Sequence, residues 1–253
     1  MNDSPELTAA LEAAAAAARV IRESYSRPLA VRLKDDRSPV TEADVRAEQA
    51  IRDVLAARFP DHAFYGEETG RRGSGEALWL VDPIDGTKAF VRGYPMFSTQ
   101  IALMRAGRLV LGVSSAPLYG ELAWAERGAG AWLNGRPLSV SAIDSIESAA
   151  LSAGNLRTLA CGPAWSRYGA LVARLDRIRG YGDFLHYHLL AGGKLDAVIE
   201  SDVNILDIAA LVTIVEEAGG RFTALDGAPV GLATTTVLAT NSRLHDPIRA
   251  ALA

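Results

Sequence analysis

The sequence is poor in the residues that build disulfide scaffolds and zinc sites. Its only cysteine, Cys161, cannot form an internal disulfide, and its four histidines are scattered without cysteine partners at metal-binding spacing. These absences favour a protein of the reducing cytoplasm. The apolar run at residues 13–18 is far too short to span a bilayer and follows no basic region, so we expect neither a membrane segment nor an export signal.

Positive charge is also limited. Lysine and arginine total 26 against 30 acidic residues, a formal net charge of -4, which argues against a protein that binds nucleic acid by neutralising its phosphates. Hydrophobic residues make up 49% of the 253 positions and charged residues 22%. This is ordinary globular usage, and the chain is long enough for one large domain or two closely packed halves.

The first part of the chain is predicted to begin with helices and to continue with strands. Ser4-Pro5-Glu6 places a cap residue, a first-turn proline and a first-turn acid ahead of an alanine-rich run. Thr41 to Asp44 begins a second amphipathic helix, which is expected to end near Phe59. Strands are expected at residues 78–81, 98–104, 108–114, 122–126 and 130–133.

A looser segment at residues 141–148 precedes a second α/β region. Its expected strands lie at residues 149–153, 197–199 and 237–239, and its expected helices at residues 165–175, 184–190 and 208–217. We therefore predict an N-terminal α+β half of residues 1–140 and a C-terminal α/β half of residues 141–253.

The most informative string is Asp82-Pro83-Ile84-Asp85-Gly86-Thr87. A buried strand is expected to end at Asp82, because Pro83 cannot continue a strand ladder, and the chain then turns into a helix start. Carboxylate oxygens suit Mg²⁺, while Gly86 and the amides of a helix start suit a phosphate group. By spacing alone, two ordinary roles, with Asp82 at a strand end and Asp85 as a helix cap, fit these aspartates as well as a metal site does.

Three further acidic positions are ambiguous when each is taken by itself. Glu67-Glu68 places adjacent carboxylates just before the strand, which suits either a bound cation or a charged turn. Asp207 begins an expected helix and therefore fits an N-cap. Asp44 fits the acid of a capping box.

Taken in order along the chain, these pieces resemble the inositol monophosphatase family of metal-dependent phosphatases. The resemblance is carried by Gly66-Glu67-Glu68, Trp79 to Thr87, Asp207 to Ala210 and Glu216 to Gly220, and it extends from the segment Lys34 to Asp44 through Gly220. It implies a mixed α/β (α+β) fold, the layered αβαβα sandwich of the metal-dependent sugar phosphatases. It also implies a homodimer.

The resemblance further implies roles for individual residues. Two or three Mg²⁺ ions would be held by oxygen ligands from Glu67, Asp82, the Ile84 carbonyl, Asp85 and Asp207. The phosphate would be bound by Asp85, Gly86 and Thr87. Asp44 and Thr87 would orient the attacking water beside Glu67, with Glu68 farther out. Leu206 and Ala89 stand where the family usually has tryptophan and asparagine, which concerns the shape of the substrate pocket and not the ligand set.

Direct attack by water is the expected chemistry. Two divalent ions about 3.5–4 Å apart can stabilise both the attacking and the leaving oxygen of a phosphoryl group. The sequence shows no Ser/His/Asp arrangement, and Cys161 beside Gly162-Pro163 suits packing or a loop better than a nucleophile.

Two strings, Arg179 to Tyr187 and Phe90 to Pro95, are more similar to the histidinol-phosphate phosphatase branch of the family. Asp183 stands where inositol phosphatases usually have a small residue, and a carboxylate suits the amino group of histidinol phosphate. Glu200 fits either a contact to the substrate amine or hydroxyl or a surface acid at a strand end.

Three other polar residues near these strings are given no catalytic role. Arg92 fits contact with phosphate, a partner subunit or solvent. His186 and His188 are expected to be structural, on different faces of one helix.

The leading prediction is therefore hydrolysis of L-histidinol phosphate in histidine biosynthesis. The alternative within the same chemistry is an inositol-1-phosphate phosphatase or a broad-specificity sugar or nucleotide phosphatase. The non-enzymatic alternative is a phosphate-sensing binding protein, which the concentration of mutually repelling acids disfavours. In each case the expected partner is a small phosphorylated molecule, without nucleic acid or membrane.

Overall fold

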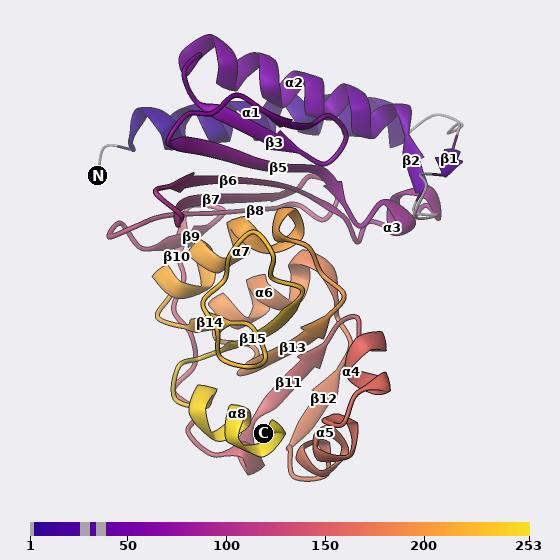
Figure 1. The fold of residues 1–253 in the computed structure, drawn as a ribbon, viewed down its shortest axis with the longest axis vertical. Helices are drawn as coiled ribbons and strands as arrows, with labels where there is room; N and C mark the ends of the chain where they lie inside the picture. The colour runs from indigo at the N-terminus through magenta and orange to yellow at the C-terminus, as the bar shows by residue number, and fades with distance from the viewer. Residues whose placement is uncertain (1–2, 26–30, 34–38) are drawn as a thin grey trace.

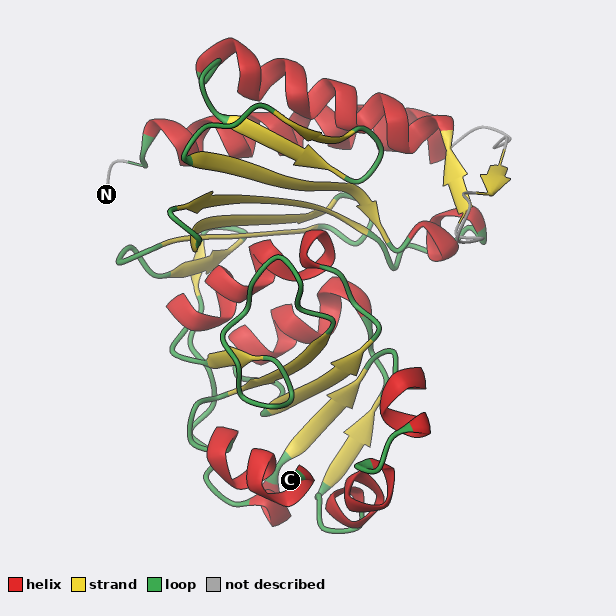
Figure 2. Ribbon diagram, viewed as in Figure 1, coloured by secondary structure: helices red, strands yellow, loops and turns green. Residues whose placement is uncertain are grey.

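The computed structural model describes residues 3–25, 31–33 and 39–253, so the beginning of the resembling segment at Lys34 lies outside the described residues. Helices and sheets alternate in five layers (Figures 1 and 2). The outermost helices on one side are α1 (Pro5–Tyr25) and α2 (Glu42–Arg58), which cover an eight-stranded sheet. Helices α6 (Asp183–Ala191) and α7 (Ile205–Glu217) lie between this sheet and a five-stranded sheet.

The last layer consists of shorter helices on the outer face of the five-stranded sheet. They are α4 (Arg157–Cys161), α5 (Trp165–Val172) and α8 (His245–Leu252). The predicted αβαβα sandwich is confirmed by this order of layers. In the described part of the chain, no helix is both long enough and apolar enough to cross a membrane.

The eight-stranded sheet is mostly antiparallel and has the order β10-β9-β8-β7-β6-β5-β3-β4. Only β3 and β5 pair in parallel. The turns Ala106-Gly107 and Asn134-Gly135 have positive φ at both residues, as a tight hairpin requires. The strands are β3 (Ala63–Gly66), β4 (Gly70–Arg72), β5 (Ala77–Asp85), β6 (Ser98–Arg105), β7 (Arg108–Ala116), β8 (Glu121–Glu126), β9 (Ala131–Leu133) and β10 (Arg136–Pro137).

The predicted end of strand β5 at Asp82 is wrong. The strand continues through Pro83 to Asp85, because its pairing with β6 shifts register between Asp82 and Asp85. Such an irregularity accommodates a residue without an N–H group, and the Pro83 carbonyl still accepts a hydrogen bond from the Thr99 hydroxyl at 2.8 Å. Both aspartates therefore belong to one continuous strand.

The five-stranded sheet has the order β12-β11-β13-β15-β14 and mixes parallel and antiparallel pairs. Short elements complete the described chain. The strands are β11 (Ala150–Ala153), β12 (Arg177–Arg179), β13 (Ala197–Ser201), β14 (Arg221–Thr223) and β15 (Thr236–Thr240), with β1 (Val31–Leu33), β2 (Pro39–Thr41), helix α3 (Thr87–Val91) and the 3-10 turn Ile146–Ser148.

Helix starts follow local capping signals. The Ser4 hydroxyl accepts the Leu7 amide at 3.0 Å at the start of α1, and Thr41 and Asp44 form a capping box at the start of α2. The prediction of Asp207 as an N-cap is wrong. Helix α7 begins three residues earlier, with Asn204 as its cap, and the Asp207 carboxylate accepts the Asn204 backbone amide at 2.9 Å.

The middle helical layer joins the two sheets. One buried cluster contains Leu80 of β5, Leu211 of α7 and Val198 of β13, so apolar side chains from both predicted halves share a core. Helix α7 lies so close to β7 that a Cβ atom at Gly112 would stand 2.2 Å from the Ala210 carbonyl oxygen. The division into residues 1–140 and 141–253 stays a prediction.

Candidate active site

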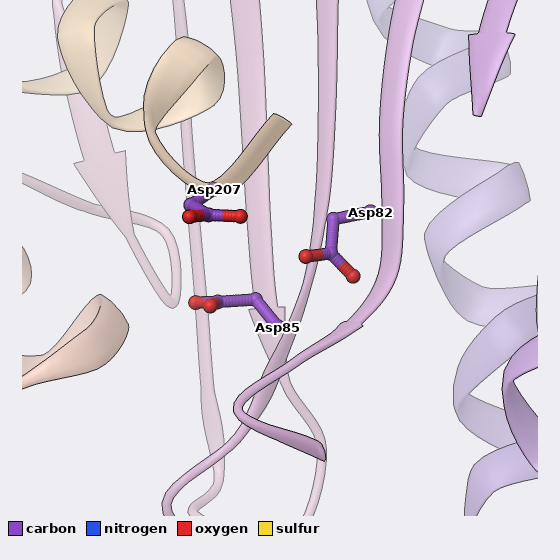
Figure 3. Close-up of side chains that lie close together, drawn as sticks. All are labelled: Asp82, Asp85 and Asp207. Atoms are coloured by element: carbon purple, nitrogen blue, oxygen red, sulfur yellow. The ribbon is translucent and has the colours of Figure 1, made fainter. Parts of the chain in front are cut away.

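Three aspartates from two elements meet at one point between the sheet and helix α7. One carboxylate oxygen from each lies within 4.8 Å of the other two, with Asp82 and Asp85 coming from β5 and Asp207 from the first turn of α7 (Figure 3). Asp82 is buried, and the other two are partly exposed to solvent. The structure thus brings together three of the residues predicted to hold metal.

The electrostatics of this cluster favour a bound cation. Loss of solvent and then repulsion from neighbouring acids, including Glu67 and Asp183, raise the pKa values of Asp82 and Asp85 well above the usual range. The same causes raise the pKa of Asp207 to about 7. A hard divalent cation prefers oxygen ligands and would relieve the repulsion, so the donor set fits Mg²⁺.

Glu67 reaches the cluster because β3 pairs in parallel with β5. Its backbone amide donates to the Val81 carbonyl at 3.1 Å, immediately before Asp82. The Glu67 carboxylate lies close enough to Asp82 to contribute to that residue's raised pKa. Ile84 is fully buried, and its carbonyl accepts the Thr87 hydroxyl at 3.0 Å.

A cavity of about 400 Å³ opens over these groups. It is mainly polar, and six of its thirteen lining residues are acidic. Its lining comprises Glu67, Asp82, Asp85, Gly86, Thr87, Lys88, Ala89, Tyr94, Asn155, Asp183, Asp202, Asn204 and Asp207. A much smaller hollow of about 30 Å³ adjoins it and is lined by Asp85, Asn155, Asp183, Tyr187, Glu200, Val203, Asp207, Ile208 and Leu211.

The turn after β5 requires a glycine, both for its backbone conformation and for its packing against the segment before β6. Gly86 has φ of 89°, and a Cβ atom there would stand 2.7 Å from the Met96 carbonyl oxygen, so only glycine fits. Helix α3 begins directly after it at Thr87. Both residues predicted to bind phosphate through their amides line the cavity.

Asp44 combines both roles that the sequence left open. Its carboxylate accepts the Thr41 amide at 2.7 Å and the Thr41 hydroxyl at 2.6 Å, as a capping-box acid does. The same carboxylate lies 3.3 Å from the Thr87 hydroxyl. Burial raises the pKa of Asp44, while the Thr41 hydrogen bonds oppose that rise.

Asp183 is the first residue of helix α6 and lies beside the metal cluster. It has φ of 45°, which is uncommon for a residue other than glycine, although aspartate tolerates it better than most. Burial, and then the neighbouring Glu200, raise the pKa of Asp183 to about 6.

Glu200, on β13, is held by donors of the protein itself. Its carboxylate accepts the Tyr187 hydroxyl at 2.7 Å and the Asn155 amide at 3.3 Å, and the His186 Nε2 atom lies 3.2 Å away. Burial alone would raise the pKa of Glu200, but these partners outweigh it and lower the pKa. Asp183 and Glu200 thus form an acidic wall next to Asp85.

The two histidines of helix α6 point to different partners, as predicted. His186 contacts Glu200 and Ser152, whereas His188 contacts Glu121 at 2.7 Å and the Ser114 hydroxyl at 2.9 Å. The proximity of His186 to the site was missed, because a lone histidine in an apolar helix carries no local signal for it. Arg92 is exposed and does not line the cavity.

Several residues of the site were not predicted at all. Lys88, Tyr94 and Asn155 line the cavity, and Tyr187 supports Glu200. Only Asn204 had a usable signal, since Asn204 and Asp207 stand at capping-box spacing before an apolar run.

Comparison with known proteins agrees with this architecture. The model of the inositol monophosphatase family matches residues 2–253, and the chain belongs to this family. A histidinol-phosphatase of Mycobacterium tuberculosis is 41% identical over 232 residues, covering 87% of this chain and 86% of the relative. An inositol-1-monophosphatase of Synechocystis is 35% identical over 221 residues, covering 85% and 76%. The crystal structure of the extragenic suppressor protein suhB from Bartonella henselae matches with a TM-score of 0.91 at 31% identity, covering 98% of each chain.

Proposed function

We propose that this chain is a Mg²⁺-dependent phosphatase that hydrolyses L-histidinol phosphate to L-histidinol and phosphate. The observation that carries the proposal is the position of the acidic wall, Asp183 and Glu200, directly beside the three clustered aspartates. The three aspartates suit metal and, through it, phosphate. The acidic wall suits a cationic group on the same small molecule. The histidinol-phosphatases among the relatives, at about 40% identity, support this substrate.

Four of the residues that would hold the ions line the cavity: Glu67, Asp82, Asp85 and Asp207. The fifth proposed ligand is the carbonyl of Ile84, which lies on β5 between Asp82 and Asp85. When bound, Mg²⁺ lowers the pKa of water and neutralises phosphoryl oxygens. We propose two or three ions, in keeping with the family resemblance.

The chain's own groups would position the reactants. The amides of Gly86 and Thr87, at the start of α3, would donate to the phosphate. Asp44 accepts the Thr87 hydroxyl, and these two groups would orient the attacking water beside Glu67. The water oxygen forms a bond to phosphorus as the bond from phosphorus to the alcohol oxygen breaks, and the alcohol leaves with a proton.

The acidic wall would select the substrate. An ammonium group in a partly dry pocket needs a charged hydrogen-bonding partner, because burial without one is costly. Glu200 is kept ionised by Tyr187, His186 and Asn155, so its charge persists at neutral pH. We propose that Asp183 and Glu200 together bind the amino group of histidinol phosphate.

An inositol-1-phosphate or broad sugar-phosphate phosphatase is the second candidate, because relatives with that name share the chain at similar coverage. The acidic wall would give a neutral polyol less binding energy than a cationic amine. We also propose a homodimer located in the cytoplasm, on the basis of the family resemblance and the single cysteine.

The test is phosphate release from L-histidinol phosphate and from inositol 1-phosphate, each with Mg²⁺ and with a chelator. We expect release that requires Mg²⁺ and a higher kcat/KM for histidinol phosphate. A preference for inositol 1-phosphate would favour the second candidate. Release from neither substrate, combined with phosphate binding, would identify a binding protein instead.

A further inference from the structure

A buried acid outside the predicted ligand set lies behind the metal cluster. Glu48 is on helix α2, one turn after Asp44, and only 1% of its surface is exposed. Its Oε2 atom accepts a hydrogen bond from the backbone amide of Glu68 at 2.8 Å, across 20 residues of sequence. A buried carboxylate is costly unless it has such a partner, so this contact is a specific one.

The contact fixes the chain on one side of Glu67. On the other side, the Glu67 amide is already bound to the Val81 carbonyl of β5. Two successive amides are therefore tied to two different layers of the fold, one to the sheet and one to helix α2. The Glu67 side chain leaves the backbone between these two ties and enters the cavity.

Gly66 belongs to the same arrangement. A Cβ atom at this position would stand 2.3 Å from Glu48 Oε2 and 2.6 Å from the Phe64 ring. The φ angle of Gly66 is not positive, so the need for glycine arises from the space that the Glu48 carboxylate and the Phe64 ring occupy. Glu48 and Gly66, which are 18 residues apart in the sequence, are therefore packed together beside the Glu67 loop.

We propose that Glu48 is a positioning residue, which holds the Glu67 loop so that the Glu67 carboxylate can bind a divalent cation together with Asp82. The inference rests on the proposed role of Glu67 as a metal ligand. Groups that orient metal ligands from behind commonly change metal affinity when they are removed. Helix α2 then serves the site twice, through Asp44 on Thr87 and through Glu48 on the Glu67 loop.

The decisive feature is a side chain of the correct length that carries a hydrogen-bond acceptor at its end. Among the residues that the structure describes, the second oxygen of Glu48 has no hydrogen-bond partner. A glutamine can therefore present its carbonyl to the Glu68 amide without breaking another hydrogen bond. A methionine has a similar volume but lacks this acceptor.

The experiment compares Glu48→Gln and Glu48→Met with the wild-type protein. Mg²⁺ binding is measured by calorimetry without substrate, and Mg²⁺ activation by phosphate release. We expect Glu48→Met to weaken Mg²⁺ binding by about tenfold to a hundredfold, with the KM for substrate at saturating Mg²⁺ nearly unchanged. Glu48→Gln should bind Mg²⁺ like the wild type.

Ile51→Val is the matched control for a packing defect on the same helix. Ile51 is fully buried in the apolar core between helix α2 and the same sheet, and its side chain has no polar atom with which to bind the Glu67 loop. This variant should lower the melting temperature without changing Mg²⁺ affinity. Gly66→Ala should also weaken Mg²⁺ binding, because its Cβ atom would displace the Glu48 carboxylate; the same atom would press on the Phe64 ring, so this variant should lower the melting temperature as well.

Unchanged Mg²⁺ affinity in Glu48→Met would overturn the inference, as would a Glu48→Gln variant that binds Mg²⁺ as poorly as Glu48→Met. If the methionine variant does not fold, Gly66→Ala takes its place, because its added Cβ atom displaces the Glu48 carboxylate; unchanged Mg²⁺ affinity in that variant would overturn the inference. These failures differ from failure of the proposed function, in which the wild-type protein itself would show neither Mg²⁺ binding nor Mg²⁺-dependent phosphate release.

Discussion

The carboxylates of the site form two groups, the metal cluster and the acidic wall, and Glu200 of the wall differs electrostatically from all the others in these two groups. The pKa of Asp183, the other residue of the wall, is raised to about 6 by burial and by Glu200. In the metal cluster, Asp82, Asp85 and Asp207 face other acids, and their pKa values are raised. On the adjoining wall, Glu200 accepts hydrogen bonds from the Tyr187 hydroxyl and the Asn155 amide, the His186 ring lies 3.2 Å away, and the pKa of Glu200 is lowered. Asp85, Asp207 and Glu200 line one hollow, so distance from bulk water alone does not account for the difference.

The contrast shows how one residue type can serve two purposes. Burial and mutual repulsion disfavour the charges of the cluster more than the hydrogen bonds to Asp82 and Asp207 can offset, so a bound cation would stabilise them. The charge on Glu200 is stabilised by the protein itself and is available to a substrate at neutral pH. Changes in the first group should therefore act through metal, and changes in the second group through substrate choice.

The largest effect is expected when the metal cluster loses one charge. Asp85→Asn should lower kcat/KM by about a thousandfold, since loss of metal stabilisation of about 4 kcal/mol corresponds to that factor. The melting temperature of the metal-free protein should stay the same or rise, because repulsion in the cluster decreases. Kinetics with histidinol phosphate and thermal unfolding in a chelator measure the two quantities.

Asp53→Asn is the control for this change, because Asp53 is an exposed acid on helix α2 and does not line the cavity. Its kinetics should match the wild type. Retained Mg²⁺-dependent activity in Asp85→Asn would contradict the ligand assignment.

Removal of metal should change stability in a pH-dependent way. The folded-state pKa of Asp207, about 7, lies above its unfolded value of 3.8, so the folded protein holds the extra proton. The stability from this group is complete below pH 3.8 and is lost as the pH rises toward 7. The metal-free protein should therefore unfold at lower temperature as the pH rises through this range.

Added Mg²⁺ should reverse that loss. At a hundredfold excess over its Kd, a ligand that binds only the folded state adds about 2.7 kcal/mol, roughly 5–10 °C for a chain of this size. His245 acts in the opposite sense, because burial lowers its pKa to about 4 and stability is lost as the pH falls from 6.5. The difference between curves with and without Mg²⁺ cancels this contribution. A difference that does not grow with pH would count against the cluster as the metal site.

Much of the metal cluster could be predicted from the sequence, because its signals are local. The string from Asp82 to Thr87 marks a strand followed by a helix, and the capping residues Ser4 and Thr41 mark helix starts where the structure has them. Even here, Pro83 was given too much weight, since a shift in register absorbs it. The family resemblance then related Asp207 to Asp85, although 122 residues separate them.

The supporting groups could not be predicted, because their partners come from tertiary packing. Glu48 looks like any acid on an amphipathic helix, and Tyr187 like any aromatic residue of a buried helix. Their importance depends on Glu68 and Glu200, which reach them only after the layers have assembled. The short edge strands β4 and β12 were missed for a different reason, because three residues carry too little of an alternating pattern to predict a strand.

The acidic wall is expected to affect substrate choice more than catalysis. Asp183→Asn should lower kcat/KM for histidinol phosphate roughly thirtyfold, because the ammonium group loses a charged partner and the transition state loses about 2 kcal/mol of stabilisation. The value for inositol 1-phosphate should change little. Asparagine tolerates the positive φ of this position, whereas Asp183→Ala would add backbone strain.

Asp202→Asn is a matched control for Asp183→Asn. Asp202 also lines the cavity and also has a positive φ of 61°, but its carboxylate already accepts the Thr158 amide and hydroxyl. Its loss of charge should affect both substrates alike. Equal losses on the two substrates in Asp183→Asn would remove the argument for specificity.

The smallest effect is expected from a support of the wall. Tyr187→Phe removes the hydroxyl that donates to Glu200 at 2.7 Å and keeps the buried ring. A hydrogen bond to a charged group contributes about 1.5 kcal/mol or more, so kcat/KM for histidinol phosphate should fall by about tenfold while Mg²⁺ affinity stays constant. Tyr168→Phe, at a buried tyrosine of α5 that lies outside the cavity, should leave both quantities unchanged. A loss of Mg²⁺ affinity in Tyr187→Phe would mean that the wall and the cluster do not act separately, because the support of one would then control the other.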